Sequence, residues 1–269
     1  MTTSPPKYLQ EDNLSEECKK LLSILPKEKG WVGSYVCNYQ GCWTPPKFLQ
    51  GVIFFQQQFQ AQDSDIYHSL RHPIFEPNHP LLVQNSHVLV PFLEHTLYID
   101  GRVPNFLTFT SPRLLATHVP FASLPKSVQD SKTKLVYLCR NPRDTFISMW
   151  HFANNLIVHH KDTNSIEEMF YLFCEGAILY GPILGMSLFH RGRNSGVVDE
   201  ILQMCSIENL SNLMVNTNGK FSTGEEYKLF FRRGEIGDWK NYFTKEMSDK
   251  LNHIIEEKFQ GSGLKFSYV

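Results

Sequence analysis

Residues 137–152, YLCRNPRDTFISMWHF, join a short apolar run to an arginine and then directly to a helical pattern. The run LVYLC is of the continuous apolar kind expected for a buried strand of a parallel sheet. Asn141 is a good helix N-cap and Pro142 suits a first helical turn, so we expect a helix over 142–157. A strand that turns at once into a long helix predicts an α/β fold with a parallel sheet.

The rest of the chain alternates in the same way. LLATHVP, near residue 118, is a second short apolar run of the buried-strand kind, and SYVCNYQ alternates as a half-buried strand does. An amphipathic helix is expected near the N-terminus, ended by Pro26. Further helices are predicted at about 46–59, 165–180, 196–204 and 245–260.

The length and the charge limit the class of protein. A chain of 269 residues suits one large domain or two small ones, and we place a single domain at 13–269 behind a polar, disordered arm at 1–12. The net charge is −1, from 26 basic and 27 acidic residues, so no bulk cationic field favours nucleic acid or a membrane surface. Any anion site must therefore be local.

The six cysteines are scattered without CxxC pairs or clustered histidines, which argues against a zinc site and a disulfide scaffold, so no metal is predicted. The first 20 residues contain no apolar run of the signal-peptide type. The longest apolar stretch, 176–190, has 15 residues and includes a proline, which is too short to span a bilayer. We therefore expect a cytoplasmic protein without membrane contact.

Arg140 lies where the predicted strand ends, the edge at which ligands of open α/β sheets gather. The free N–H groups and the dipole of the following helix would add to its positive charge, and Ser148 further along could add a hydroxyl. The junction thus suits a phosphate or a carboxylate. From the residues alone, a structural ion pair of Arg140 is about equally well supported.

A second basic stretch, FFRRGEIGDWKNYFT at 230–244, contains two adjacent arginines before a glycine. Arg232, Arg233 and the N–H of Gly234 could form a nest around an anion. The alternative is a solvated loop whose arginines form surface pairs. Taken together with Arg140, the stretch favours a polyanionic ligand.

His118 ends the predicted strand RLLATHVPF, at the same sheet edge as Arg140. Most of the 11 histidines are expected to be surface or core residues. A histidine beside an anion site, with a reference pKa near neutrality, is a plausible general base.

These stretches, together with YQGCW, FQAQDSDI and FYLFCEGAILYGP, resemble the plant-type cytosolic sulfotransferases over nearly the whole chain. The resemblance implies a P-loop-NTPase-like parallel sheet flanked by helices. It also implies transfer of a sulfuryl group from 3′-phosphoadenosine 5′-phosphosulfate (PAPS) to a hydroxyl of a small metabolite of the flavonoid, steroid or jasmonate type. His118 would take the proton of that hydroxyl.

The resemblance also assigns the basic residues. Arg140 and Ser148 would hold the 3′-phosphate of PAPS, and Arg232, Arg233 and Gly234 would complete the clamp. Cys205 and Ile207 match family positions near the adenine.

Two family segments have no counterpart in the sequence. The family carries a Pro-Lys-Ser-Gly-Thr-Thr-Trp loop soon after the DSDI strand, but here DSDI continues into YHSLRHPIFEP, and no lysine occurs from Phe48 to Pro125. A strand with a Tyr-Glu-Asp signature is also missing. The resemblance therefore implies internal truncations near 66–72 and 184–195, with missing strands that would leave sheet edges and apolar faces exposed.

Two functions remain open on this basis. One is a PAPS-dependent sulfotransferase. The other is a catalytically inactive family member that retains at most 3′-phosphoadenosine binding. An unrelated α/β nucleotide kinase is disfavoured because the chain has no GxxxxGK[ST] loop.

Overall fold

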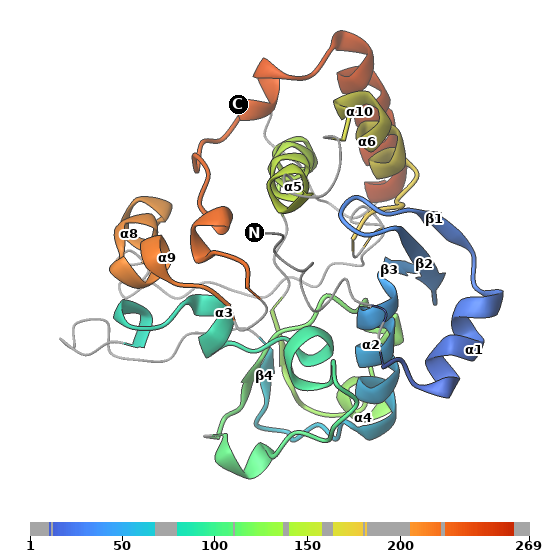
Figure 1. Cartoon of the computed structure of the whole chain (residues 1–269), viewed down its shortest axis with the longest axis vertical. Helices are drawn as coiled ribbons and strands as arrows, with labels where there is room; N and C mark the ends of the chain where they lie inside the picture. The colour runs from blue at the N-terminus through green and yellow to red at the C-terminus, as the bar shows by residue number, and fades with distance from the viewer. Residues whose placement is uncertain are drawn as a thin grey trace.

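The structure is a computed structural model, shown in Figure 1. It describes residues 11, 13–67, 80–109, 111–136, 140–157, 164–179, 181, 205–221 and 224–260. The helix predicted at 196–204, the apolar strand end at 137–139 and nearly all of the arm predicted at 1–12 lie outside the described residues.

The N-terminal region is a small antiparallel sheet between two helices, and its strand order is β1-β2-β3. Its elements are α1 (Glu16–Ile24), β1 (Lys27–Lys29), β2 (Tyr35–Tyr39), β3 (Cys42–Thr44) and α2 (Pro46–Gln58). Ser15 caps α1 by accepting a hydrogen bond from the N–H of Cys18, and α1 ends just before Pro26. The predicted helices and the predicted strand of this region are confirmed.

A parallel sheet of order β5-β4-β6 confirms the predicted α/β class. Its described strands are β4 (Ile66–Tyr67), β5 (Leu114–Leu115) and β6 (Lys134–Leu135). The expectation of a buried strand is wrong for the described part of β6 and the residue after it, where Leu135 is 41% exposed and Val136 is 47% exposed. Exposed apolar side chains on this strand are what an interrupted sheet is expected to show.

A buried ion pair holds two of these strands together where they begin. Arg113 Nε donates to Asp65 Oδ1 over 2.7 Å, and Arg113 Nη2 also donates to the carbonyl of Gln60. The guanidinium lies against the rings of Phe59 and Phe106. Because Asp65 precedes β4 and Arg113 precedes β5, the pair aligns the starts of the two strands, and β5 leads to the predicted base.

Short helical turns lie between the strands of the parallel sheet. Between β4 and β5 they are η2 (Pro80–Leu82), α3 (Ser86–Leu89), η3 (Leu93–Leu97) and η4 (Phe106–Thr108), and between β5 and β6 they are η5 (Phe121–Ser123) and α4 (Lys126–Gln129). The C-terminal half contains α5 (Pro142–Ile157), α6 (Ile166–Cys174), α8 (Ile207–Asn212), α9 (Met214–Asn218), η7 (Tyr227–Phe230), η8 (Asp238–Asn241) and α10 (Lys245–Phe259). The predicted helices at 142–157 and 245–260 are confirmed, whereas the one at 165–180 is shorter than expected.

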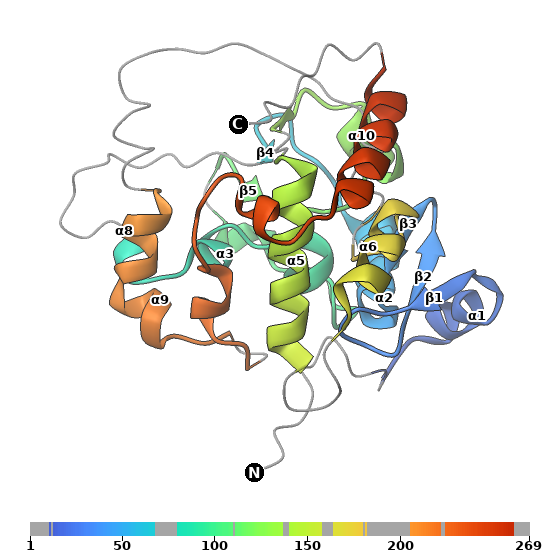
Figure 2. The same cartoon turned by 90° about the horizontal axis from the view of Figure 1, so that it is seen from above.

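The central helix α5 is packed between α6 and the segment that leads into α10 (Figure 2). Phe146 and Ile147 of α5 are fully buried in this core, and Phe146 makes edge contacts with Phe170, Phe173 and Phe243. The start of α5 is thereby fixed relative to the loop that carries the two adjacent arginines. None of the described helices has the length and apolarity required to cross a membrane.

Candidate functional site

His118 lies just after β5, and its neighbourhood is built by a backbone bridge. Leu93 N–H donates to the carbonyl of Ala116, and Ala116 N–H donates to the carbonyl of Pro91. This bridge places the π-helical turn η3 beside the end of β5. Single π turns in proteins are often found at functional sites.

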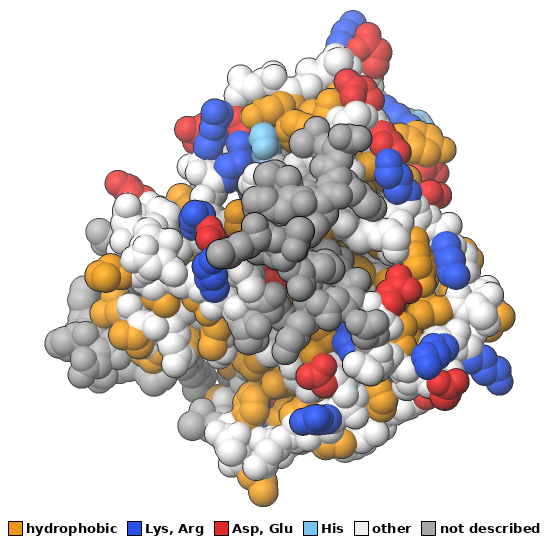
Figure 3. Space-filling view, in the orientation of Figure 1, with side chains coloured by type: hydrophobic (Ala, Val, Ile, Leu, Met, Phe, Trp, Pro, Cys, Tyr) orange, Lys and Arg blue, Asp and Glu red, His pale blue; other side chains and the backbone are white. Residues whose placement is uncertain are grey.

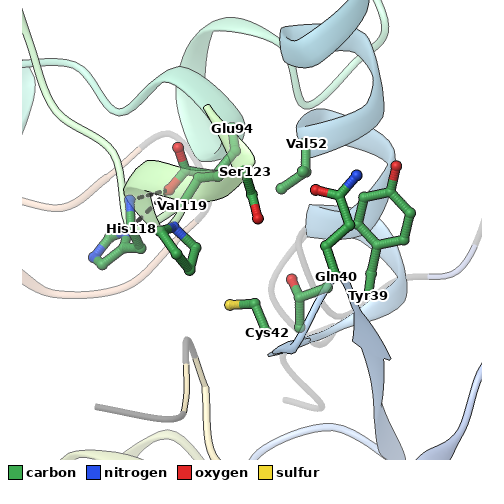
Figure 4. Close-up of a pocket in the computed structure, with 10 residues that line it drawn as sticks. Tyr39, Gln40, Cys42, Val52, Glu94, His118, Val119 and Ser123 are labelled. Carbon is green, nitrogen blue, oxygen red and sulfur yellow. Dashed lines mark hydrogen bonds and ion pairs between the residues drawn. The ribbon is translucent and has the colours of Figure 1, made fainter. Parts of the chain in front are cut away.

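Glu94 of this turn is the partner of His118. Its side chain is 1% exposed and accepts hydrogen bonds from His118 Nδ1 and from the N–H of His118, each over 2.9 Å, and from Thr117 Oγ1 (Figure 4). A carboxylate that accepts on Nδ1 holds the imidazole in the tautomer protonated there, so the nitrogen that can act as a base is Nε2.

The charges of this corner are well defined at neutral pH. Burial acts to raise the pKa of Glu94, but the neighbouring His95 and the hydrogen bonds from His118 outweigh it and lower the pKa to about 2. Burial lowers the pKa of His95 to about 3, so its ring is neutral. The corner therefore contains one fixed negative charge, directed at His118.

Aromatic rings fix the plane of the His118 ring. Phe92 stacks on it at a centroid distance of 4.4 Å, and His95 stacks on it at 4.8 Å. His95 in turn stacks on Phe48 of α2 at 4.0 Å. The ring plane is thus set by packing, while Glu94 sets the tautomer.

A small hollow, partly open to solvent, adjoins this corner (Figure 4). It is lined by Tyr39, Gln40, Cys42, Thr44, Val52, Glu94, His118, Val119, Pro120 and Ser123. Burial raises the pKa of the Cys42 thiol to about 12, so this thiol is neutral at physiological pH. The hollow brings YQGCW, one of the stretches quoted for the resemblance, next to the predicted base.

Glu94, His95 and His118 are also residue types that bind transition metals, and their ligand atoms lie within 4.8 Å of one another. However, His118 Nδ1 and Glu94 Oε1 are only 2.9 Å apart. Two ligands of a tetrahedral zinc ion, each about 2.0–2.1 Å from the metal, are separated by about 3.3 Å. The arrangement corresponds better to a hydrogen-bonded acid–base pair.

The start of α5 matches the sequence expectation. The side chain of Asn141 accepts from the N–H of Arg143, and its carbonyl accepts from Thr145. Arg140, directly before this cap, is exposed, and Ser148 is half-buried on the second turn. The predicted junction of a basic residue with a capped helix start is therefore present.

The two adjacent arginines converge on one buried carboxylate. Arg232 Nη2 lies 2.6 Å from Asp238 Oδ2, and Arg233 Nη1 lies 2.9 Å from Asp238 Oδ1. Burial acts to raise the pKa of Asp238, but the hydrogen bonds from Arg232 and Asn241 and the charges of both arginines lower it. The predicted basic nest thus contains its own counter-ion, Asp238. This pairing is a feature of the alternative interpretation, in which the arginines form ion pairs within the loop.

Asp144 ties this loop to α5. Its carboxylate accepts hydrogen bonds from the N–H groups of Gly237 and Trp239, at 3.0 and 3.3 Å. The loop crosses α5 in Figure 2, and basic, acidic and histidine side chains gather where it passes in Figure 3. Gly237 and Trp239, which follow Arg232–Gly234 along the chain, therefore contact the helix start that Arg140 precedes.

Two further observations locate this loop. Arg232 and Arg233 contribute to the lowered pKa of His151, after burial as the main cause, and His151 lies one turn beyond Ser148. Gly234 has a φ of 70°, and a Cβ there would lie 2.2 Å from Ile207 Cγ2. The close approach joins the predicted clamp to the position matched to the adenine site.

Aromatic contacts connect the two corners. The ring centroid of His87 lies 5.9 Å from that of Phe92, which stacks on His118, and 4.6 Å from that of Phe230. Phe230 lies 5.1 Å from Phe152, which is one turn beyond Ser148 on α5. The predicted base and the arginine loop therefore lie on either side of one aromatic cluster.

Sequence reasoning missed Glu94, Asp144 and Asp238. Glu94 is a lone acidic residue in the apolar stretch VLVPFLEHTLY, and such a residue is expected to be paired when buried. That pattern is the signal that could have identified it.

Comparison with known proteins identifies the family. A sequence model of the sulfotransferase domain matches residues 31–188 and 184–263. Cytosolic sulfotransferase 5 of Arabidopsis thaliana is 37% identical over 319 aligned positions, which cover 96% of this chain and 99% of that protein. Cytosolic sulfotransferase 6 of the same plant is 38% identical, and the alignment covers 96% of this chain and 97% of that protein. The chain belongs to the sulfotransferase family, within the plant-type cytosolic group.

Solved structures agree with this assignment. A crystal structure of a candidate steroid sulphotransferase from Arabidopsis thaliana has a TM-score of 0.66 at 33% identity, and covers 98% of this chain and 100% of that one. A mouse sulfotransferase complexed with adenosine 3′,5′-bisphosphate (PAP) has a TM-score of 0.58 at 18% identity. The match covers 85% of this chain and 96% of that one. Together with the family match, these structures show that the chain has the sulfotransferase α/β fold, so the predicted fold class is confirmed.

Proposed function

We propose that this protein uses PAPS as co-substrate to transfer a sulfuryl group to the hydroxyl of a small, largely apolar molecule. The observation that carries the proposal is the Glu94–His118 hydrogen bond beside a solvent-connected hollow. His118 would accept the hydroxyl proton at Nε2, and Glu94 would stabilise the imidazolium that forms.

The arginine corner supports binding of the 3′-phosphate end of the co-substrate. Asp238 neutralises one of the two charges of Arg232 and Arg233, and Arg140 adds another at the start of α5. Each guanidinium has five N–H donors, so pairing with Asp238 leaves donors that a phosphate can use. The Arg233 side chain is 51% exposed to solvent, so a ligand could reach it. The residues present therefore fit a phosphorylated nucleotide, with Ser148 and the N–H of Gly234 as further contacts.

When bound, PAPS supplies the sulfuryl group, and adenosine 3′,5′-bisphosphate (PAP) leaves with the electron pair of the broken sulfur–oxygen bond. The chain's own contribution is to hold the nucleotide, to orient the acceptor and to remove its proton. The lining of Tyr39, Cys42, Val52 and Val119 supports an acceptor with an apolar body, and a flavonoid, a steroid or a hydroxyjasmonate would each meet this requirement.

A transfer assay tests the proposal. Purified protein, shown to be folded by its near-ultraviolet circular dichroism, is incubated with ³⁵S-labelled PAPS and a panel of flavonols, hydroxysteroids and hydroxyjasmonates. We expect label on at least one acceptor, and label lowered about 10²–10⁴-fold with His118→Gln. If the folded protein labels no acceptor, the proposed activity is rejected for this chain.

A second function, nucleotide binding without turnover, is supported by a specific observation. The alignment with cytosolic sulfotransferase 5 spans 319 positions against 269 residues here, so at least 50 of its positions have no residue in this chain. The family match also divides at 184–188, within the truncation predicted at 184–195. Without the lysine-bearing loop, charge developing on the leaving phosphate has fewer donors, and even one such donor is worth about 10²–10³ in rate.

Calorimetry separates the two functions. If PAP binds and binding weakens in Arg232→Ala or Arg140→Ala, but no acceptor is labelled, the chain is a nucleotide-binding family member. If PAP does not bind to the folded protein, both functions are excluded.

A further inference from the structure

We propose that Glu94 is a positioning residue, whose buried carboxylate fixes His118 in the tautomer protonated at Nδ1. The inference deepens the proposed function and rests on it for the chemical role of Nε2. It depends on three features of the chain: the donors that meet at the carboxylate, the turn that carries it, and the helix that supports this turn.

Both oxygens of the Glu94 carboxylate accept hydrogen bonds from His118 or its neighbour Thr117. Oε1 accepts from both the N–H and the Nδ1 of His118, and Oε2 accepts from Thr117 Oγ1. Both hydrogen bonds to Oε1 come from the same residue, so the carboxylate fixes the backbone and the ring of His118 together. An ionised carboxylate only accepts, and His118 Nδ1 must therefore be the donor.

The turn η3 fixes the position of the Glu94 carboxylate. Glu94 is the second residue of η3, and the bridge between Phe92 and Ala116 fixes this turn against the end of β5. Glu94 itself is 1% exposed. A buried charge in a rigid turn is costly to place unless it is paired, and here the pairing is with the predicted base and its neighbour.

The helix α2 supports the turn from the other side. A Cβ at Gly51 would lie 2.0 Å from the carbonyl oxygen of Glu94, so only glycine allows this approach of the two backbones. Glu94 is thus contacted from two segments of the chain, one carrying Thr117 and His118 and the other carrying Gly51.

Nitrogen-15 NMR of the His118 ring tests the inference in the full-length protein. At pH 8, long-range ¹H–¹⁵N spectra distinguish the two neutral tautomers. We expect the wild-type ring to be protonated at Nδ1 and the Glu94→Gln ring to be a mixture of both tautomers, because the amide can donate as well as accept. Glu17→Gln, the same substitution at an exposed residue that bonds Gln57, is the matched control and should resemble wild type. A wild-type ring protonated at Nε2, or a Glu94→Gln ring identical to wild type, would overturn the proposal.

Kinetics provide the second readout. Glu94→Gln should lower kcat about 10- to 100-fold, a part of what a general base contributes, and leave the KM for PAPS unchanged. Turnover equal to wild type would also overturn the proposal. If wild type labels no acceptor but shows the Glu94-dependent tautomer, the proposed activity fails and the positioning role of Glu94 stands.

A milder variant covers the case in which Glu94→Gln does not fold. Thr117→Val keeps the charge of Glu94 but removes the hydrogen bond to Oε2, and should lower kcat about 2- to 10-fold. Thr117→Ser retains the hydroxyl and should restore the rate. A Thr117→Val protein with the wild-type rate and the wild-type tautomer would contradict the proposal.

Discussion

The corner around His118 and the corner around Arg232 each contain a buried carboxylate, and the two carboxylates have opposite consequences. Glu94 meets a group that gains a proton during the proposed reaction, so its fixed charge favours that step. Asp238 meets two groups that are already cationic, so it removes half of the charge they could offer an anion. The predicted base has its carboxylate partner within the chain, whereas the predicted anion site needs the charge of Arg140 or of a ligand in addition to Arg232 and Arg233.

The difference also concerns anchoring. Glu94 is held by a backbone bridge and by the close approach of α2. The arginine loop is tied to α5 through the two N–H groups that donate to Asp144, and the Arg233 side chain remains half exposed. We therefore expect substitutions in the first corner to affect stability and rate together, and substitutions in the second to affect mainly ligand affinity.

The largest effect is expected for His118→Gln. Removing the base should lower the transfer rate about 10²–10⁴-fold while PAP affinity stays within about twofold of wild type. Radiolabel transfer and calorimetry measure the two quantities on the same preparation. A loss of PAP affinity equal to the loss of rate would show that the two corners are not separate.

Arg232→Ala should weaken PAP binding about 10- to 100-fold, because a hydrogen bond to a charged group is worth about 1.5–3 kcal/mol. Lys126→Ala removes the same charge from a surface pair with Asp130 on α4 and is the control. Calorimetry at low salt measures both variants. The comparison of the two corners is refuted if both substitutions weaken binding equally.

Gly51→Ala should lower the free energy of unfolding by about 1–3 kcal/mol, since its Cβ would overlap the carbonyl oxygen of Glu94. Gln58→Ala, at an exposed position of the same helix, should change it by less than about 0.5 kcal/mol. Urea denaturation measures both values. Equal stabilities would mean that η3 is not supported by α2 as described.

The smallest effect is a gradual dependence of stability on pH. The pKa of His95 is lowered to about 3 and that of Glu94 to about 2, so the unfolded chain binds more protons than the folded one below about pH 6.5. Stability should fall as pH falls, by up to about 1.4 kcal/mol per pH unit for each proton. His95→Gln should remove the part of this loss between pH 6.5 and 4.5, where Glu94 does not yet contribute. Urea midpoints at pH 7.5, 6 and 5 test this, and parallel curves for the two proteins would contradict it.

The sequence predicted the parts of the fold that depend on local signals. The cap at Asn141 and the proline at 142 define the start of α5, and two short apolar runs before it indicate a parallel sheet. The exposure of Leu135 could not be predicted from its own run, because it depends on which segments cover β6.

The site was predicted in part for a similar reason. The positions of His118 and of the arginine stretch follow from the strand end and from the resemblance. The partners Glu94 and Asp238 are set by tertiary packing: Glu94 is 24 residues from His118 along the chain, and the bridge at Ala116 brings the two segments together.

The central claim is that the arginine corner grips the 3′-phosphate of an adenosine nucleotide beside the His118 base. The most direct measurement compares the affinity of the wild-type protein for PAP and for adenosine 5′-phosphate, which lacks only that group. We predict that PAP binds about 10- to 100-fold more tightly, and that Arg232→Ala removes this preference. Equal affinities for the two nucleotides in the folded wild-type protein would contradict the account.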